Sequence, residues 1–447
     1  MLIPLSIKQV AIDAAKVAEG MYISKLDRPW LETPFIFQGF EVREQAEIDM
    51  LQRYCSVVYI DVEKGKLSDD QVRRLIQMQQ QAGKPQRQVA RRKAKEPGRF
   101  SRWLQKLLMR IGLYRQAVSL ASSGQEGYRI QTTVRAEADA ARDAYKILAK
   151  QHRQMMDRAT VKPQVLTDDL REAVQPAIDS VLRNPNALAW TVFSRKRSSE
   201  NYNRSVGTAI WCLMFGRHLE FDREMLEDLA MGGMLLDIGN AMIPKSIAAT
   251  AGAISGEQRN LLRQHIEFGS QILASSQGIK QSVADMVGCH HERFDGSGYP
   301  RGLHGNQIPP FARIAGIADS YDAMTSESPY SKPMAAYDAA RALNDMRGKE
   351  FAAEVVEQFI AAMGMFPVAS VVELNDGSVG VVLEQNPNNV LRPKVLLLLD
   401  ENRNPLPERE VLEMRDLPLD ATVPGARWIV GGHEHGAFGI DPADIFS

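Results

Sequence analysis

The sequence predicts a mainly α-helical protein with a small α/β or β-rich domain at its start and a small β appendage at its end. Residues 130–183 and most of 200–364 are rich in helix-forming residues with few breakers. Short β-branched and aromatic runs occur within residues 1–82 and again after Pro367. The 447 residues are 44% hydrophobic and 24% charged, which is typical of a globular protein. At roughly 150 residues per domain, this length allows two or three domains.

The first 82 residues contain two stretches with strand character, 35–40 and 57–62 (VVYIDV), with turn-forming Pro29, Pro34 and Gly65 around them. We expect the chain to continue in four further parts. These are a basic linker with an amphipathic helix at 83–129, a helical connector at 130–199, the main helical domain at 200–366 and the β appendage at 367–447.

The basic linker is unlike the rest of the chain. Eleven Lys or Arg residues and a single acidic residue, Glu96, lie between residues 84 and 115. Apolar residues recur at helical spacing over 100–111, which predicts an amphipathic helix. Such a helix could contact an anionic membrane surface. Packing against another domain or a second subunit is the more common role, and we favour it here.

Composition excludes several classes of protein. The 54 basic residues nearly balance the 55 acidic ones, so no large positive field favours nucleic acid as a partner. Cys55, Cys212 and Cys289 are widely spaced, which suggests neither a disulfide framework nor a thiolate zinc site. The sequence has no signal-peptide pattern, and no apolar run approaches the ~20 residues that span a bilayer. We therefore expect a cytoplasmic protein.

The β appendage is predicted from three short runs at 369–374, 379–383 and 395–399. Asn375-Asp376-Gly377 separates the first two as a turn.

The main helical domain contains a candidate metal site. His265, His290 and His291 lie between Asp237 and Asp319, at intervals of about a helix and its connection. Imidazoles and carboxylates together suit Fe, Mn or Zn. A single histidine on an apolar helix is more often structural, and an adjacent pair changes that balance only modestly.

The surrounding sequence makes the case stronger, because residues 290–326 (HHERFDGSGYPRGLHGNQIPPFARIAGIADSYDAMTS) resemble the HD-GYP domains of bacteria. These domains are a branch of the HD metal-dependent phosphohydrolases. His265, in RQHIEFG, matches a further histidine of that family, and residues 16–40 resemble the domain of unknown function that often precedes it. The resemblance implies an HD-type helical phosphohydrolase fold that hydrolyses cyclic di-GMP with two or three metal ions, commonly iron or manganese.

The resemblance assigns roles to particular residues. The implied metal ligands are Asp237, His265, His290, His291, Asp319 and Glu200. Asp237 is the catalytic candidate if the protein is active. The implied ligand-binding or partner-binding loop includes Asp295, Gly298, Tyr299, Pro300, Asp322 and Lys332.

Five positions depart from the family pattern. Arg204 stands where the family has its first histidine, and LDIGN at 236–240 replaces HDIGK, so that Leu236 and Asn240 replace a histidine and a lysine. Ser328 and Ser331 replace basic residues that would contact phosphates. Leucine has no donor atom, and a guanidinium stays protonated, so neither can ligate a metal. Each lost phosphate contact typically costs about 1.5 to 3 kcal/mol.

These departures predict a degenerate site. We expect at most one iron or manganese ion, and the sequence leaves open that none binds. Arg204 is expected to pair with Asp237 or Asp319 as a fixed cation in place of a metal ion. The favoured function is a regulatory or partner-binding module of cyclic di-GMP signalling, with cyclic di-GMP binding weak or lost. The alternative is an active phosphodiesterase with a reduced metal site. A diguanylate cyclase domain is the implied partner, and homo-oligomers are left open.

Overall fold

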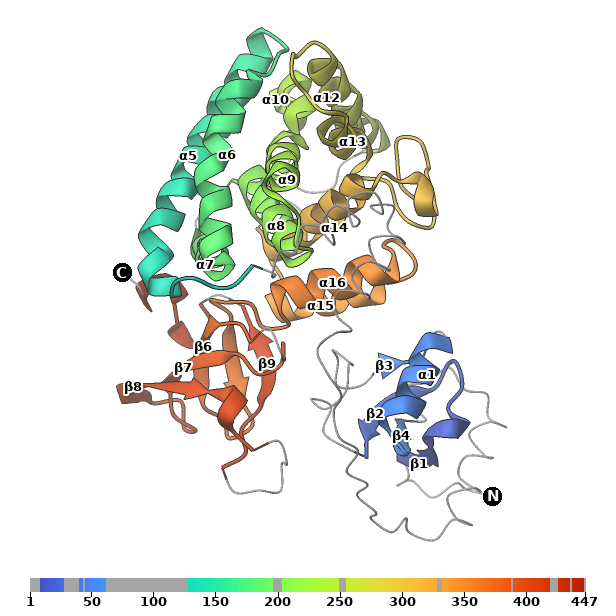
Figure 1. Cartoon of the computed structure of the whole chain (residues 1–447), viewed down its shortest axis with the longest axis vertical. Helices are drawn as coiled ribbons and strands as arrows, with labels where there is room; N and C mark the ends of the chain where they lie inside the picture. The colour runs from blue at the N-terminus through green and yellow to red at the C-terminus, as the bar shows by residue number, and fades with distance from the viewer. Residues whose placement is uncertain are drawn as a thin grey trace. The chain divides into compact units, whose positions relative to one another are not determined.

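The computed structural model describes residues 9–27, 40–42, 45–61, 128–195, 203–248, 255–327, 332–386, 389–418, 425–434 and 436–445 (Figure 1). The chain divides into two compact units. One comprises Met1–Glu96 with Leu417–Ala426, and the other comprises Pro97–Asp416 with Arg427–Ser447. The helix predicted at 100–111 lies outside the described residues, as do Glu200, Ser328 and Ser331.

The smaller unit contains an antiparallel sheet with the strand order β1-β4-β2-β3 and the helix α1. Its elements are β1 (Gln9–Asp13), η1 (Ala14–Lys16), β2 (Tyr22–Leu26), β3 (Phe40–Glu41), α1 (Gln45–Tyr54) and β4 (Val57–Asp61). Val10 pairs with Ile60, and both side chains are fully buried with Leu51 of α1 in one apolar core. The predicted α/β domain is therefore confirmed, including the strand expected at 57–62. Most of the run at 35–40 lies outside the described residues.

The larger unit is mainly helical, as predicted. Its first helices are α5 (Val134–Val161), α6 (Thr167–Arg183), α7 (Pro185–Arg195), α8 (Arg204–His218), α9 (Arg223–Leu235), η4 (Ile238–Met242) and α10 (Lys245–Ala248). They are followed by α11 (Gly256–Arg263), α12 (His265–Ala274), α13 (Gln281–Cys289), η5 (Gly305–Gln307), α14 (Pro310–Thr325), α15 (Ala336–Asp345) and α16 (Ala353–Met363). None of the helices within the described ranges is long and apolar enough to cross a membrane.

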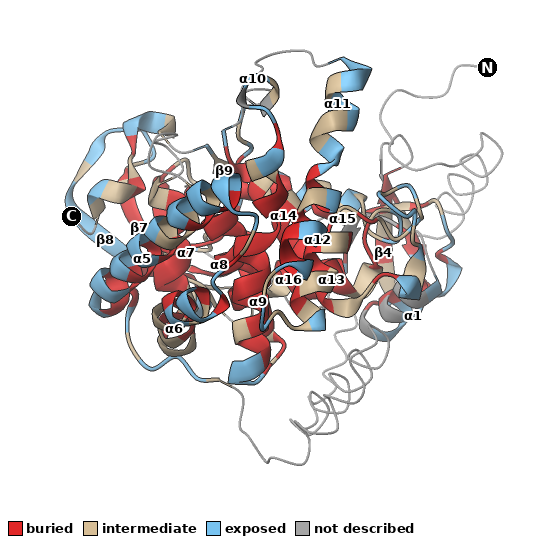
Figure 2. Cartoon of the chain, turned by 90° about the horizontal axis from the view of Figure 1, so that it is seen from above, coloured by how far each residue is buried: buried red, intermediate tan, exposed pale blue. Residues whose placement is uncertain are grey.

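Helix α8 lies at the centre of this unit. Every residue from 205 to 216 is buried, as expected of a helix that is apolar on all sides (Figure 2). The helix packs against α9, α14 and α16. A Cβ at Gly233 of α9 would lie 2.5 Å from the Ala209 Cα, so glycine allows α8 and α9 to approach closely. On the α14 side, Trp211 meets Tyr321 edge to face at 5.6 Å. The start of α8 is thereby fixed beside α14.

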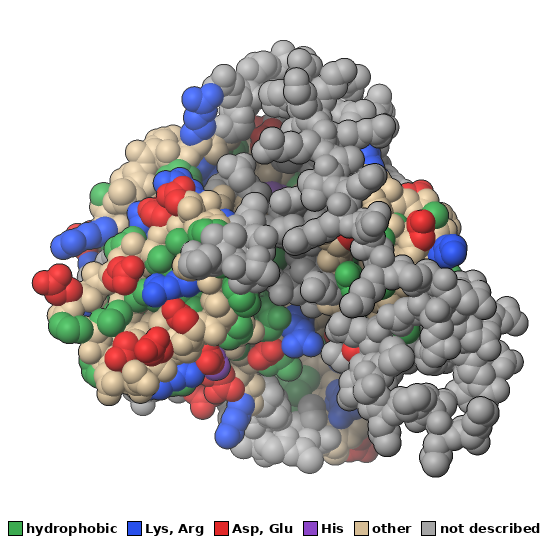
Figure 3. All heavy atoms as spheres, turned by 90° about the horizontal axis from the view of Figure 1, so that it is seen from below, with side chains coloured by type: hydrophobic (Ala, Val, Ile, Leu, Met, Phe, Trp, Pro, Cys, Tyr) green, Lys and Arg blue, Asp and Glu red, His purple; other side chains and the backbone are tan. Residues whose placement is uncertain are grey.

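The C-terminal part of this unit is an antiparallel sheet with the strand order β8-β7-β6-β5-β9. The strands are β5 (Val371–Leu374), β6 (Val379–Glu384), β7 (Lys394–Leu399), β8 (Pro405–Glu413) and β9 (Ile429–His433), accompanied by η6 (Met414–Asp416), η7 (Ala437–Gly439) and η8 (Pro442–Ile445). The three predicted strands are confirmed. Gly377 adopts φ +91° in the turn predicted between the first two of them. In the view of Figure 3, acidic and basic side chains of the described residues are intermixed, as the balanced composition predicts.

Candidate metal site at a histidine cluster

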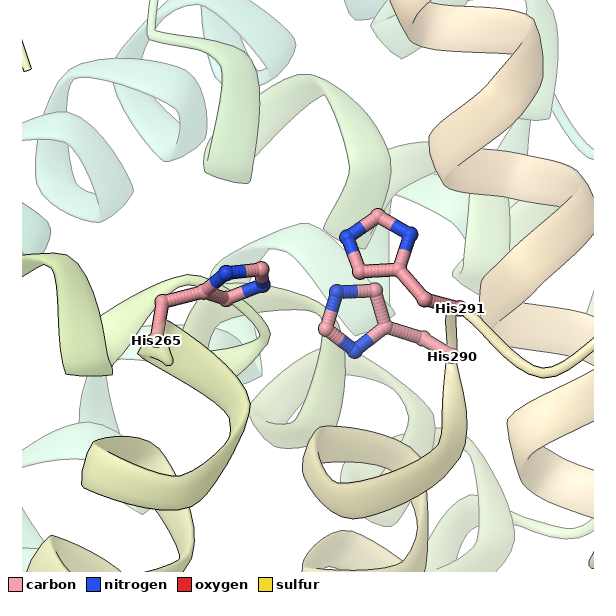
Figure 4. A group of neighbouring side chains, drawn as sticks. All are labelled: His265, His290 and His291. Atoms are coloured by element: carbon pink, nitrogen blue, oxygen red, sulfur yellow. The ribbon is translucent and has the colours of Figure 1, made fainter. Parts of the chain in front are cut away.

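Three histidines that are far apart in the sequence meet in the helical unit (Figure 4). His265 is the first residue of α12, His290 caps the end of α13 and His291 follows it. One ring nitrogen from each lies within 4.8 Å of the other two. The ring centroids of His290 and His291 are 4.2 Å apart, and those of His265 and His291 are 5.2 Å apart. The packing of α12 against α13 therefore brings together the three histidines predicted as ligands.

Backbone carbonyls fix which nitrogen is available on two of these rings. The Nδ1 atom of His265 lies 2.7 Å from the Leu262 carbonyl oxygen, and Nδ1 of His290 lies 3.1 Å from the Val287 carbonyl oxygen. A carbonyl can only accept, so each Nδ1 carries the proton and each Nε2 keeps its lone pair. Nε2 of His265 is buried and has no hydrogen-bond partner among the described residues. An orphaned lone pair beside two other imidazoles suits a metal ion, and donation from Nδ1 to a carbonyl is the usual support of such a ligand.

Burial favours the neutral form of His290 and His291. It lowers the pKa of His290, although the carboxylates of Asp319 and Asp237 oppose the change. The pKa of His291 falls well below its ordinary value because of burial and of the neighbouring rings of His290 and His265. Neutral imidazole is the form that binds metal, so the cluster is prepared for an ion near neutral pH.

Asp237 adds a carboxylate to the cluster. Its Oδ1 lies 3.6 Å from Nε2 of His265. Burial disfavours the charged form, but the Arg204 guanidinium and the rings of His265 and His290 outweigh it, so the pKa of Asp237 is lowered. Gly239 explains the close approach, because a Cβ there would overlap the backbone of His265. Three imidazoles and one carboxylate form a donor set that fits Fe, Mn or Zn.

The neighbouring half of the site has different chemistry. Arg204, at the start of α8, donates from Nη2 to Oδ1 of Asp319 on α14 at 2.7 Å. The Asp319 side chain is 7% exposed and that of Arg204 is 46% exposed. Asp319 and Asp237 raise the pKa of Arg204, so the guanidinium stays charged. The predicted pairing of Arg204 is confirmed, and Asp319 is the partner. Leu236, which directly precedes Asp237, is buried, and its side chain has no atom that could bind a metal ion.

The loop after His291 closes over the cluster. The Tyr299 ring stacks on the His291 ring at 4.7 Å, and the Arg263 guanidinium lies 4.6 Å from the Tyr299 ring centre. A Cβ at Gly298 would overlap the backbone of residues 291–293, so only glycine fits there. Glu292 holds the loop by accepting hydrogen bonds from the backbone N–H groups of Arg301 and Leu303, both at 2.8 Å. Tyr299 thus belongs to the wall of the site, whereas Pro300, the next residue, is exposed.

Comparisons with known proteins agree with this geometry. Family models match an HD domain at residues 186–355, a domain of unknown function (DUF3391) at 9–170 and a KOW domain associated with HD domains at 371–422. The chain is 34% identical over 233 residues to cyclic di-GMP phosphodiesterase PA4108 of Pseudomonas aeruginosa, covering 52% of this chain and 56% of that protein. The matches identify the domain that holds the histidine cluster. Residues 186–355 are an HD domain, and their Gly-Tyr-Pro loop follows the HD-GYP pattern.

Other curated relatives are similar over shorter stretches or at lower identity. A cyclic di-GMP phosphodiesterase of Thermotoga maritima is 40% identical over 134 residues, which is 30% of this chain and 36% of that protein. The response regulator RpfG of Xanthomonas campestris, a cyclic di-GMP phosphodiesterase, is 28% identical over 48% of this chain and 55% of its own length. The matches thus span 36 to 56% of the length of these three relatives.

Among solved structures, the chain resembles Bd1817, a HDG"Y"P protein from Bdellovibrio bacteriovorus. The TM-score is 0.40 and the sequence identity 16%, over 78% of this chain and 98% of that chain. This likeness is too distant to bear on the site.

Three further residues predicted for the HD-GYP loop, Asp322, Asp295 and Lys332, make their described contacts with residues other than the three histidines. Asp322 is fully buried, and its carboxylate accepts hydrogen bonds from Trp211 Nε1 at 2.8 Å and from Ser326 at 3.2 Å. It joins α14 to α8 instead of facing the cluster. Asp295 accepts hydrogen bonds from the Ser297 backbone and hydroxyl and shapes the loop. The Lys332 side chain is exposed.

Two residues beside the site were not predicted from the sequence. Asn203 directly precedes Arg204, and its side-chain amide nitrogen lies 2.8 Å from Nδ1 of His152 on α5. Nothing in the local pattern marks His152, since it is one polar residue in a long helix that is rich in charges. Asn203 could have been recognised as the N-cap of α8 because it precedes an apolar helical stretch.

Proposed function

We propose that this protein is a regulatory HD-GYP module of bacterial cyclic di-GMP signalling, with weak or no phosphodiesterase activity. The observation that carries the proposal is the ion pair between Arg204 and Asp319. It places a fixed cation where a second metal ion would need an imidazole and a free carboxylate. Its working partner is proposed to be a protein with a diguanylate cyclase domain, and its location the cytoplasm.

Asp237, His265, His290 and His291 would hold one iron or manganese ion. The donor types, the neutral rings and the orphaned Nε2 of His265 support this assignment. When bound, such an ion supplies a Lewis acid for a phosphoryl group. The protein's own contribution is to favour the neutral form of His290 and His291 by burial, to orient the rings of His265 and His290 through carbonyls, and to cover His291 with the Tyr299 ring.

The second ion of a paired site would lack its ligands. Arg204 carries a permanent charge, and Leu236 has no lone pair. The Asp319 oxygen that would otherwise face an ion is occupied by the guanidinium. A two-ion site stabilises both the attacking and the leaving oxygen, and one ion with a fixed cation reproduces only part of that effect. Weak or absent hydrolysis follows.

The alternative function is an active phosphodiesterase with a reduced metal site. The intact group of Asp237 and three histidines favours it, as do the relatives named as cyclic di-GMP phosphodiesterases. In this case Asp237 would be the catalytic residue, and Arg204 would contact phosphate in place of an ion.

Metal content and turnover distinguish the two functions. We expect the full chain, loaded with manganese or ferrous ion, to hold at most one ion in elemental analysis and to convert little cyclic di-GMP. The double variant Arg204→His with Leu236→His restores both imidazoles and should bind a second ion and gain activity. Arg204→Lys keeps the cation and serves as the control. Two ions in the wild type, with steady formation of the linear dinucleotide, would establish the enzyme instead.

A further inference from the structure

His291 is supported in a different way from the other two histidines of the cluster (Figure 4). The rings of His265 and His290 are oriented by backbone carbonyl oxygens at 2.7 and 3.1 Å. Within the described ranges, neither ring nitrogen of His291 has a hydrogen-bond partner. Its ring instead stacks on the Tyr299 ring, with 4.7 Å between the ring centres and 23° between the planes. Because stacking favours one plane for the imidazole, Tyr299 does for His291 what the carbonyls do for the other rings.

Tyr299 lies on a loop that returns to His291. Its backbone N–H donates to the His291 carbonyl oxygen at 3.1 Å. Gly298 allows this return, because a Cβ there would lie 2.5 Å from the same oxygen. These contacts place the backbone of Tyr299, but they do not fix the torsions of its side chain. The Tyr299 hydroxyl has no hydrogen-bond partner in the described part of the chain, so another contact must hold the ring against the imidazole.

Arg263 supplies that contact. It is the last residue of α11, and its guanidinium carbon lies 4.6 Å from the centre of the Tyr299 ring. This distance is within the range of a cation–π interaction, in which a ring attracts a cation over its face. The preceding residue, Leu262, has the carbonyl that orients His265, and His265 begins α12. The junction of α11 and α12 is therefore connected to His265 through a carbonyl and to His291 through the Tyr299 ring.

We propose that Arg263 is a positioning residue of the metal site, which acts on His291 through the ring of Tyr299. This inference rests on the proposed metal site. By its charge alone Arg263 would weaken metal binding, because a cation repels a metal ion. Its side chain is exposed, so solvent screens that repulsion. The two effects have opposite signs, so the direction in which a substitution changes metal affinity distinguishes positioning from charge.

Metal affinity of the full chain tests the proposal. The Arg263→Gln variant has no cation and should bind Mn²⁺ and Co²⁺ roughly two- to fivefold more weakly, as the loss of an exposed cation–π contact predicts. Arg263→Lys keeps a cation and should recover most of the affinity. Arg259→Gln removes the same charge at an exposed position one turn earlier in α11 and should not weaken binding. Circular dichroism verifies that each variant is folded. Unchanged or tighter binding by Arg263→Gln would overturn the inference.

A background without the aromatic ring shows whether Arg263 acts through Tyr299. Tyr299→Leu removes the stack on His291 and should itself weaken metal binding. Adding Arg263→Gln to this variant should weaken binding no further, because the two residues form one chain of contacts. If Arg263→Gln causes an equal loss of affinity in both backgrounds, Arg263 acts by another route and the inference is wrong.

A further measurement does not depend on metal. In NMR spectra of histidine-labelled protein without metal, the ring protons of His291 should be shifted by the ring current of Tyr299. Their signals are identified by their loss in His291→Gln. We expect Arg263→Gln to move them toward their positions in Tyr299→Leu, and Arg259→Gln to leave them in place. Signals that do not move in Arg263→Gln would contradict the proposal. If the wild type binds no metal, the proposed metal site fails, and the NMR result alone decides the role of Arg263.

Discussion

The ion pair between Arg204 and Asp319 should stabilise the helical unit, and a double-mutant cycle isolates its contribution. The cycle comprises Arg204→Gln, Asp319→Asn and the double variant, all kept in chelator so that metal binding does not contribute. Each substitution removes a charge and keeps a polar side chain of similar size. The coupling between the two changes therefore reports the pair itself.

The magnitude follows from the geometry. The pair is a charge-assisted hydrogen bond of 2.7 Å, a class that contributes about 1.5 to 3 kcal/mol. Asp319 is 7% exposed, but Arg204 is 46% exposed, so solvent screens part of the attraction. We expect a coupling of about 1.5 kcal/mol, at the lower end of that range. For a unit of this size, with an unfolding entropy of about 2.1 cal/mol/K per residue, that corresponds to a shift of about 2 °C in melting temperature.

Urea unfolding followed by circular dichroism measures the four free energies of unfolding. The same cycle on Arg223 and Asp179 is the control, because this pair also has an N–O distance of 2.7 Å but both side chains are about half exposed, at 49% and 45%. Its coupling should stay below about 0.5 kcal/mol. If the coupling free energy between the Arg204 and Asp319 changes is also below about 0.5 kcal/mol, the guanidinium is not the fixed cation of the site.

Three further outcomes can be measured on the same protein. Trp211→Phe removes the donor to the buried Asp322 carboxylate and should lower the free energy of unfolding in urea by about 1.5 to 3 kcal/mol; a change below about 0.5 kcal/mol would contradict that contact. The pKa of His152 falls from 6.5 unfolded to about 4 folded, so the unfolded state binds more protons and stability should decrease as pH falls below 6.5. Down to pH 4 this group should cost about 3 kcal/mol, and His152→Gln should flatten that part of the pH profile. Gly298→Ala forces a Cβ into the backbone of residues 291–293 and should weaken Mn²⁺ binding in calorimetry, whereas Asn306→Ala, at an exposed position further along the same loop, should leave it within twofold.

Much of the candidate site could be predicted because several of its residues lie close together in the sequence. The adjacent pair His290 and His291, and the Gly-Tyr-Pro loop after them, form one continuous stretch whose residue types have no reason in packing alone. The replacement of an expected imidazole by Arg204 was equally visible, since a guanidinium cannot bind a metal ion. The departure at Arg204 thus marked a position whose side chain lies beside the cluster and pairs with Asp319.

Other features depended on contacts between distant helices. The sequence left Arg204 a choice of two carboxylates, and the packing of α8 against α14 selected Asp319, 115 positions away. Asp322 belongs to the same repeated pattern as Asp319, yet its side chain points to Trp211 because successive helical positions face different neighbours.

The sequence by itself determined the helical class, the two flanking β regions and the ligand types of the site, because periodicity and side-chain chemistry are properties of short stretches. Only the tertiary structure decided which groups meet there. The contact of His152 with Asn203, 51 positions away, shows the difference, since it depends on how helix α5 packs against α8, and that packing is set by the whole core.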